Sequence, residues 1–199
     1  MSLEYNPKST FVRKRRRNKR EEEEEEEIKE CDKDIDIIVI GNRNVGKTSL
    51  LFQYANKMHT ETYIPTVGFD YLQKLIQTYD GNKVRVKFWD TSGAEDAMEN
   101  IAKNIYKCAS GFIVMYDVTD IQSYNDVYHW MNLLDEYSLS NSYVVIIGNK
   151  SDRKEDRKIS KEEGVELAAC YDVKFMETSV FQDKNIKKTL VRMISNIVD

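Results

Sequence analysis

From Asp34 onward, short apolar runs alternate along the chain with segments of helical periodicity. Two of the runs, Phe112–Tyr116 and Tyr143–Ile147, are almost uniformly apolar, which is typical of strands covered on both faces in a parallel sheet. In Val84–Phe88, apolar and charged residues alternate, as in a strand with one less buried face. The pattern predicts six strands, at Ile35–Ile40, Phe69–Thr78, Lys83–Trp89, Phe112–Tyr116, Tyr143–Ile147 and Lys174–Glu177.

Turn and helix signals connect these strands. Asp80-Gly81, between the second and third strands, predicts a hairpin. The last helix is predicted over Asn185–Val198, because four apolar residues there fall on one stripe: Ile186, Leu190, Ile194 and Ile197. Strands that alternate with helices predict a three-layer α/β/α fold with a mostly parallel six-stranded sheet. The ligand site of such a fold lies at the carboxyl ends of the strands.

Composition and charge narrow the class of protein. The chain has 199 residues, a net charge of −4 and 41% hydrophobic residues, which suits one domain with a tail. Its three cysteines, Cys31, Cys108 and Cys170, are widely spaced and indicate thiols in a reducing compartment. No apolar run approaches the roughly 18 residues needed to cross a bilayer, and the N-terminus has no signal-peptide core. We therefore expect a cytoplasmic protein.

The first 33 residues carry ten basic and ten acidic side chains and little apolar content. A basic run, Arg13–Arg20, is followed directly by seven glutamates, Glu21–Glu27. Because such a segment cannot offset its ordering entropy by burial, we predict a disordered charged extension over residues 1–33 and a folded domain over residues 34–199. A nuclear address and an anionic-membrane contact are alternatives that the glutamates weaken, and nucleic-acid binding is a minor one.

The stretch Gly41–Thr48, GNRNVGKT, satisfies the pattern G-x-x-x-x-G-K-[ST] and stands after a predicted buried strand and before a helix. Its glycines permit backbone angles that turn N–H groups inward, and with the helix N-terminus these groups make an anion cradle. Lys47 would reach the β and γ phosphates of a nucleotide, and the Thr48 hydroxyl would bind Mg²⁺. The predicted phosphate contacts are Asn42, Arg43, Asn44, Val45, Gly46, Lys47, Thr48 and Ser49.

A second motif indicates the base of that nucleotide. Asn149-Lys150-Ser151-Asp152, an N-K-x-D, closely follows the predicted strand Tyr143–Ile147. The Asp152 carboxylate can accept the N1–H and the 2-amino group of guanine, a donor pair that adenine does not offer. Since ATP would leave this carboxylate buried and unpaired, the site would reject ATP strongly. The sequence therefore favours a guanine nucleotide.

With these motifs the sequence resembles the Ras superfamily of small GTPases, and within it the Rab branch, over about Asp34–Val198. The stretches that carry the resemblance are GNRNVGKTSL, YIPTVGFDY, VKFWDTSGAE, GFIVMYDVTD, VVIIGNKSD and METSV. The resemblance implies a P-loop small G-protein fold, GTP or GDP with Mg²⁺ as ligands, and a monomeric switch in vesicle trafficking or signalling. It also implies effectors, exchange factors and GTPase-activating proteins that bind through the switch regions.

The same resemblance assigns roles to individual residues. The implied Mg²⁺ ligands are Thr48, Thr66, which also senses the γ-phosphate, and Asp90, which acts through water. The residues that the resemblance implies for catalysis at the γ-phosphate are Lys47, Thr66, Gly93 through its amide, and Arg43. The other implied nucleotide contacts are His59, Tyr63, Asn149, Lys150, Asp152, Ser179 and Val180. Trp89 is either a core aromatic or part of the effector-reading surface between the switches, and both readings can hold.

Three positions depart from the family pattern near the γ-phosphate. The glutamine that orients the attacking water in relatives is Ala94 here, and a methyl group cannot position water. Ser92 replaces the usual alanine. Arg43 stands where relatives carry a small residue, and three readings stay open: it obstructs the water and an incoming arginine finger, which we favour; it acts on the γ-phosphate in cis; or it is solvated without effect.

Two further departures concern the guanine pocket and one the lipid anchor. His59 replaces a phenylalanine that packs on the guanine, which predicts faster nucleotide release at a cost of about 1 kcal/mol. Phe181 replaces the common lysine after the serine pair. No cysteine follows Cys170 and Ser2 excludes myristoylation, so we expect a natural terminus without a prenyl anchor rather than a trimmed one, and a cytoplasmic protein peripheral on internal membranes.

Two functions from different classes remain after these observations. The first is a Rab-like GTPase that hydrolyses GTP slowly and recruits effectors in its GTP form. The second is a pseudo-GTPase, a binding module that is constitutively GTP-bound or exchanges rapidly without meaningful turnover. Ala94 favours the second, whereas the retained Lys47, Thr48, Thr66 and Asp90 keep both open.

Overall fold

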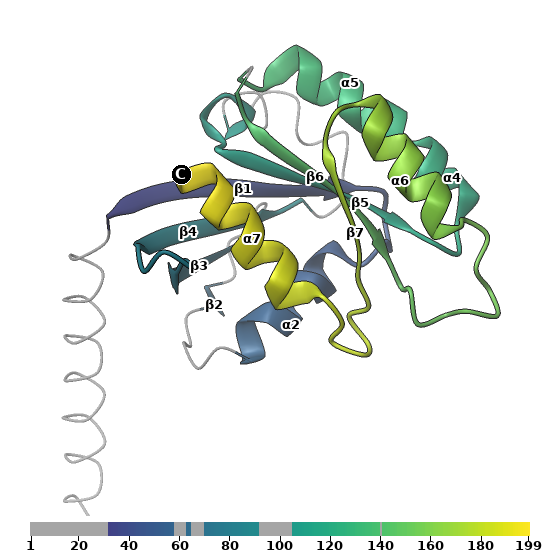
Figure 1. The fold of residues 1–199 in the computed structure, drawn as a ribbon, viewed down its shortest axis with the longest axis horizontal. Coiled ribbons are helices and arrows are strands. Elements are labelled where there is room, and N and C mark those ends of the chain that lie inside the picture. Colours follow the sequence, from purple (N-terminus) through teal and green to yellow (C-terminus); the bar gives the residue numbers. More distant parts are fainter. Residues whose placement is uncertain (1–31, 58–62, 65–69, 92–104, 140) are drawn as a thin grey trace, which may run out of the picture.

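The computed structural model describes residues 32–57, 63–64, 70–91, 105–139 and 141–199. Within these residues, seven strands form one sheet in the order β2-β3-β4-β1-β5-β6-β7 (Figure 1). The pairs β2–β3 and β3–β4 are antiparallel, and the other pairs are parallel. The strands are β1 (Lys33–Gly41), β2 (Tyr63–Ile64), β3 (Asp70–Gln77), β4 (Lys83–Asp90), β5 (Gly111–Asp117), β6 (Tyr143–Asn149) and β7 (Lys174–Glu177).

Helices cover both faces of this sheet (Figure 1). Helices α2 (Lys47–Lys57) and α7 (Ile186–Val198) pack on one face, and α4 (Ile121–Asn125), α5 (Val127–Tyr137) and α6 (Lys161–Cys170) pack on the other. Each face buries its own apolar cluster against the strands, which hides both sides of the central strands from water. The predicted three-layer α/β/α architecture with a mostly parallel sheet is confirmed.

The six predicted strands are all present, with ends within two residues of the predicted ones. Every residue of β5 is buried, and so are the last five residues of β6, as expected for strands covered on both faces. Buried and partly exposed residues alternate along β4, and Gly81 turns the β3–β4 hairpin at φ 90°. The pattern missed β2, because an edge strand of two residues is too short to show a hydrophobic period.

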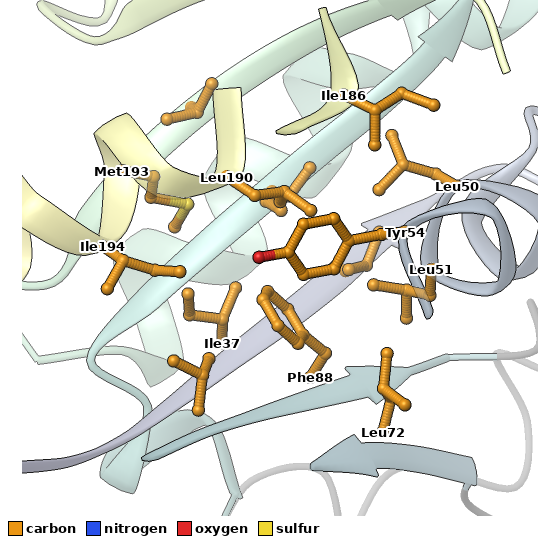
Figure 2. Close-up of a cluster of buried hydrophobic side chains, with 14 of the residues drawn as sticks. Ile37, Leu50, Leu51, Tyr54, Leu72, Phe88, Ile186, Leu190, Met193 and Ile194 are labelled. Atoms are coloured by element: carbon orange, nitrogen blue, oxygen red, sulfur yellow. The ribbon is translucent and has the colours of Figure 1, made fainter. Parts of the chain in front are cut away.

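Aliphatic side chains surround two aromatic rings in the core between the sheet, α2 and α7 (Figure 2). Tyr54 of α2 meets Phe88 of β4 edge to face, with ring centroids 5.7 Å apart. The predicted apolar stripe of the last helix also faces this core. Ile186, Leu190 and Ile194 are buried, and Ile197 is partly buried. This packing fixes α2 against the sheet, and with it the loop that leads into α2.

Residues 1–31, which include Cys31, lie outside the described residues, so the disorder predicted for the N-terminal extension stays a prediction. Cys108 and Cys170 are exposed free thiols. Among the described residues, no helix has the length and apolar content that a membrane span requires.

Candidate functional site

A pocket of about 760 Å³ lies where the chain leaves β1, β6 and β7. Its volume falls within the usual range of small-molecule sites. The loop before α2, the loop after β6 and the turn after β7 line it together, so the two sequence motifs share one site at the carboxyl ends of the strands. The lining residues are Arg43, Asn44, Gly46, Lys47, Thr48, Ser49, Asn149, Lys150, Asp152, Arg153, Val180 and Phe181.

The loop between β1 and α2 has a shape that requires its glycines. Gly41 has φ 136° and Gly46 has φ 103°, while Asn44 occupies the left-handed region at φ 66°. A Cβ at Gly41 would lie 2.2 Å from the Met115 carbonyl oxygen, and one at Gly46 would lie 2.4 Å from Asn149 Nδ2. Any larger residue at either position would therefore push the loop away from the sheet.

Lys47, the first residue of α2, is only 5% exposed. Its Nζ donates hydrogen bonds to the carbonyl oxygens of Gly41 (2.7 Å) and Asn42 (2.8 Å), which holds the ammonium against the loop. The N-terminus of α2 adds partial positive charge, and its first turn contains no acidic residue. A buried cation beside a helix N-terminus suits a phosphate chain.

Thr48 and Asp90 meet beside this loop. The Thr48 hydroxyl donates to Asp90 Oδ2 at 2.5 Å, which joins the start of α2 to the end of β4. Hydroxyl and carboxylate oxygens are the kind of ligand that Mg²⁺ prefers. The two side chains therefore fit an Mg²⁺ ion shared with phosphate oxygens, whereas Thr66, the third predicted ligand, lies outside the described residues.

Asn149 connects the two ends of the pocket. Its Nδ2 donates to the Val45 carbonyl oxygen at 2.9 Å, and its Oδ1 accepts from the Thr178 hydroxyl at 3.0 Å. The residue is 1% exposed, so both bonds are shielded from water. Its amide thereby fixes the loop before α2 to the segment that follows β7.

Asp152 is oriented from behind by Ser179. The Ser179 hydroxyl donates to Asp152 Oδ1 at 2.5 Å, and the same oxygen of Ser179 accepts from the Gln182 backbone N–H at 3.0 Å. Ser179 is fully buried, whereas Asp152 lines the pocket. This leaves Asp152 Oδ2 and the second lone pair of Oδ1 as acceptors for a ligand.

Lys150 is anchored by its ammonium to Asp117 at the end of β5. The Nζ–Oδ2 distance is 2.6 Å, and Thr119 donates to the other carboxylate oxygen through its N–H and its hydroxyl. Burial by itself raises the pKa of the Asp117 carboxyl, but the hydrogen bonds from Lys150 and Thr119 outweigh it and leave the pKa below its ordinary value. The anchored ammonium leaves the aliphatic stem of Lys150 to line the pocket.

Some predicted contacts lie behind the pocket rather than on its wall. Val45 is buried in the core, Ser179 supports Asp152, and the Asn42 side chain faces α5. Arg153 lines the pocket although the sequence did not single it out, and its place directly after N-K-x-D is the signal that could have found it.

Other predicted residues fall in the undescribed segments. These are His59, Thr66, Ser92, Gly93 and Ala94. Tyr63 is the first residue of the edge strand β2.

Trp89 of β4 is partly buried in the cluster beneath α4, α5 and α6. Its indole N–H donates to Asp36 Oδ1 at 2.8 Å, and its ring lies 5.3 Å from that of Tyr71. These contacts support the reading of Trp89 as a structural aromatic. The effector-reading role stays a prediction.

The fold and the site define a class of protein. A glycine-bounded loop leads from a buried parallel strand into a helix that begins with a buried lysine, which is the arrangement of P-loop nucleotide-binding proteins. Residues 36–199 match the model of the Ras family. The chain belongs to this family.

Several Rab proteins are similar to the chain. The Ras-related protein Rab-3A of Homo sapiens is 38% identical over 163 residues, which cover 82% of this chain and 73% of that protein. Rab-3C of Bos taurus is 37% identical, with coverage of 82% and 71%, and Rab-3 of Caenorhabditis elegans is 37% identical, with coverage of 82% and 74%. The protein is therefore a Rab-related small GTPase. Its family implies binding of guanine nucleotide, Mg²⁺, effectors, exchange factors and GTPase-activating proteins.

Proposed function

We propose that this protein is a molecular switch that binds GTP or GDP with Mg²⁺, hydrolyses GTP slowly and recruits effectors in its GTP form. The observation that carries the proposal is the shared pocket, in which Lys47 lines one end and Asp152 the other. A pocket of about 760 Å³ has room for a nucleotide and spans both the anion site and the base-selecting carboxylate.

At the phosphate end, Lys47 and the amides of the loop bind the β and γ phosphates. Thr48, Thr66 and Asp90 would hold Mg²⁺, with Asp90 acting through water, and the ion would supply positive charge at the phosphate oxygens. The Gly93 amide, which belongs to switch II, binds the γ-phosphate. The state of switch II therefore depends on whether the γ-phosphate is present. These assignments follow the family pattern and the Thr48–Asp90 contact.

At the base end, Asp152 accepts the N1–H and 2-amino group of guanine, while Val180 and the Lys150 stem flank the ring. Calorimetry with Mg²⁺ tests this directly. GDP should bind at least about 100-fold more tightly than ADP, because adenine leaves the carboxylate unpaired. Equal affinity for both, or no heat with either, would overturn the proposal.

Hydrolysis is proposed to be slow because Ala94 cannot orient the attacking water. In single-turnover assays with γ-labelled GTP, Ala94→Gln should accelerate phosphate release by about tenfold or more. Ala94→Leu is the matched control, because it adds similar bulk without an amide and should not accelerate release. Arg43→Gly should raise the rate if the guanidinium obstructs water, and lower it if the guanidinium acts on the γ-phosphate.

The second candidate is a binding module without meaningful turnover, which Ala94 favours. Phosphate release that matches a protein-free blank would select this candidate. The nucleotide that co-purifies with the protein gives a second readout: GTP supports impaired turnover, whereas GDP supports working chemistry.

The Rab resemblance further suggests vesicle trafficking or signalling, in the cytoplasm and peripherally on internal membranes. The basic run Arg13–Arg20 would add a contact with anionic lipid. Comparing the distribution of the tagged full chain with that of a variant in which this run is neutralised tests the contact. An unchanged distribution would show that the basic run does not contribute to membrane binding.

A further inference from the structure

Asn42 belongs to the loop that binds phosphate in the proposed function, yet its side chain faces α5. Its Nδ2 donates to Asp126 Oδ2 at 2.5 Å, and its Oδ1 accepts from the Trp130 indole N–H at 2.8 Å. Both partners are more than 80 positions away in the sequence. Each end of the amide is therefore matched to a partner of opposite character.

The Asp126 carboxylate accepts hydrogen bonds from two side chains, one in the loop before α2 and one in α4. It is the N-cap residue of α5, but its side chain makes no capping hydrogen bond. Its second oxygen accepts from Gln122 Nε2 at 2.7 Å. The backbone of Asp126 is helical, with φ −73° and ψ −8°, so its side chain is not placed to cap α5 and both carboxylate oxygens accept from side chains instead.

Trp130 is 6% exposed, and its one polar atom is satisfied by Asn42. A buried indole N–H without a partner is costly, so Trp130 and Asn42 fix each other. The ring itself is packed in the apolar cluster beneath α5, which gives the contact a rigid base.

The backbone of Asn42 contacts the phosphate-binding lysine. Its carbonyl oxygen accepts from Lys47 Nζ at 2.8 Å, so Asn42 lies between α5 and the ammonium. We propose that Asp126 and Trp130 are positioning residues that hold the phosphate loop in its binding shape through Asn42. The inference rests on the proposed function, because the loop must bind a nucleotide for its shape to matter.

The first test removes the contacts one at a time and measures release of a fluorescent GDP analogue. Trp130→Phe keeps an aromatic ring, although a smaller one, and loses the N–H donor, and it should release GDP about fivefold faster. Asn42→Asp keeps the acceptor for Trp130 but sets two carboxylates against each other, and should release it more than about tenfold faster. Tyr128→Phe, an exposed residue of the same helix, is the matched control and should leave release unchanged.

A swap distinguishes positioning from damage. In the double variant Asn42→Asp with Asp126→Asn, the new amide can donate to the new carboxylate, so the bond between positions 42 and 126 forms with its donor direction reversed. The bonds from Trp130 and Gln122 keep their direction. Release should return to within about twofold of the unmodified protein, which a merely disrupted fold would not do. Comparing GDP with GMP gives a second readout: Trp130→Phe should weaken GDP binding and leave GMP binding unchanged, because GMP lacks the β-phosphate.

The outcomes separate the two proposals. If the unmodified protein binds no guanine nucleotide, the proposed function fails and this inference fails with it. If it binds GDP but Trp130→Phe and Asn42→Asp release GDP at its rate, the positioning role is overturned while the proposed function stands. If GDP and GMP weaken equally, or the swap recovers nothing, α5 supports general stability and not the phosphate loop.

Discussion

The two ends of the pocket are built differently. At the phosphate end the backbone sets the geometry, through the positive φ of Gly41 and Gly46 and a lysine whose ammonium touches two carbonyl oxygens. At the base end side-chain contacts set the geometry, since Ser179 orients Asp152 and Asp117 anchors Lys150. Changes at the phosphate end should therefore weaken every nucleotide, and changes at the base end should alter the choice among nucleotides.

The largest effect is expected for Lys47→Ala. The variant loses charge-assisted hydrogen bonds to the β and γ phosphates, each of about 1.5–3 kcal/mol, so a non-hydrolysable GTP analogue should bind more than about 100-fold more weakly. The matching xanthosine triphosphate analogue should lose the same factor, because the base plays no part. Calorimetry with both nucleotides measures this. Lys188→Ala, on the exposed side of α7, is the control, and unequal losses for the two bases would contradict the comparison.

Asp152→Asn should act on selectivity instead. The new amide offers a donor where guanine presents its 2-amino group and xanthine presents an oxygen. GDP should bind about 100-fold more weakly, and xanthosine diphosphate should gain. Competition between the two nucleotides measures the ratio, and Asp135→Asn, exposed on α5, serves as the control. A uniform loss for both bases would mean that Asp152 supports the loop and does not read the base.

The sequence predicted the part of the site that the backbone builds better than the part that depends on side-chain contacts. The pattern from Gly41 to Thr48 predicted the loop because glycine and lysine have few substitutes where backbone approaches backbone. The side-chain direction of Asn42 could not be predicted, since it depends on Asp126 and Trp130, which belong to no motif and meet the loop only after α5 packs on the sheet. Local patterns thus gave the strands and the loop, whereas long-range polar pairing needed the fold.

Asp117→Asn tests whether the base end depends on a charge outside the pocket. The variant should lower the free energy of unfolding at pH 7 by about 1.5 kcal/mol, because the Lys150 ammonium loses its ionised partner. Since the folded pKa of Asp117 lies below its ordinary value, this stabilisation is fully present above about pH 4 and is lost as the pH falls through the folded value.

Urea unfolding of the protein and of Asp117→Asn at pH 7, 5 and 3 measures this dependence. The difference between the two should hold from pH 7 to 5 and shrink toward pH 3. Asp135→Asn should show no such change. A difference that stays constant down to pH 3 would mean that the ion pair with Lys150 is not its source.

The smallest effect is expected at Phe181, at the rim of the base end. The ring is 89% exposed, and two backbone hydrogen bonds between Ser179 and Lys184 close the turn that carries it. If it covers a bound base, Phe181→Ala should speed GDP release about threefold, because aromatic contacts contribute about 0.5–1.5 kcal/mol and this one is open to water. Tyr79→Ala, equally truncated and 70% exposed on the β3–β4 turn, should change nothing. Release at the same rate from both variants would mean that the Phe181 ring does not cover the base.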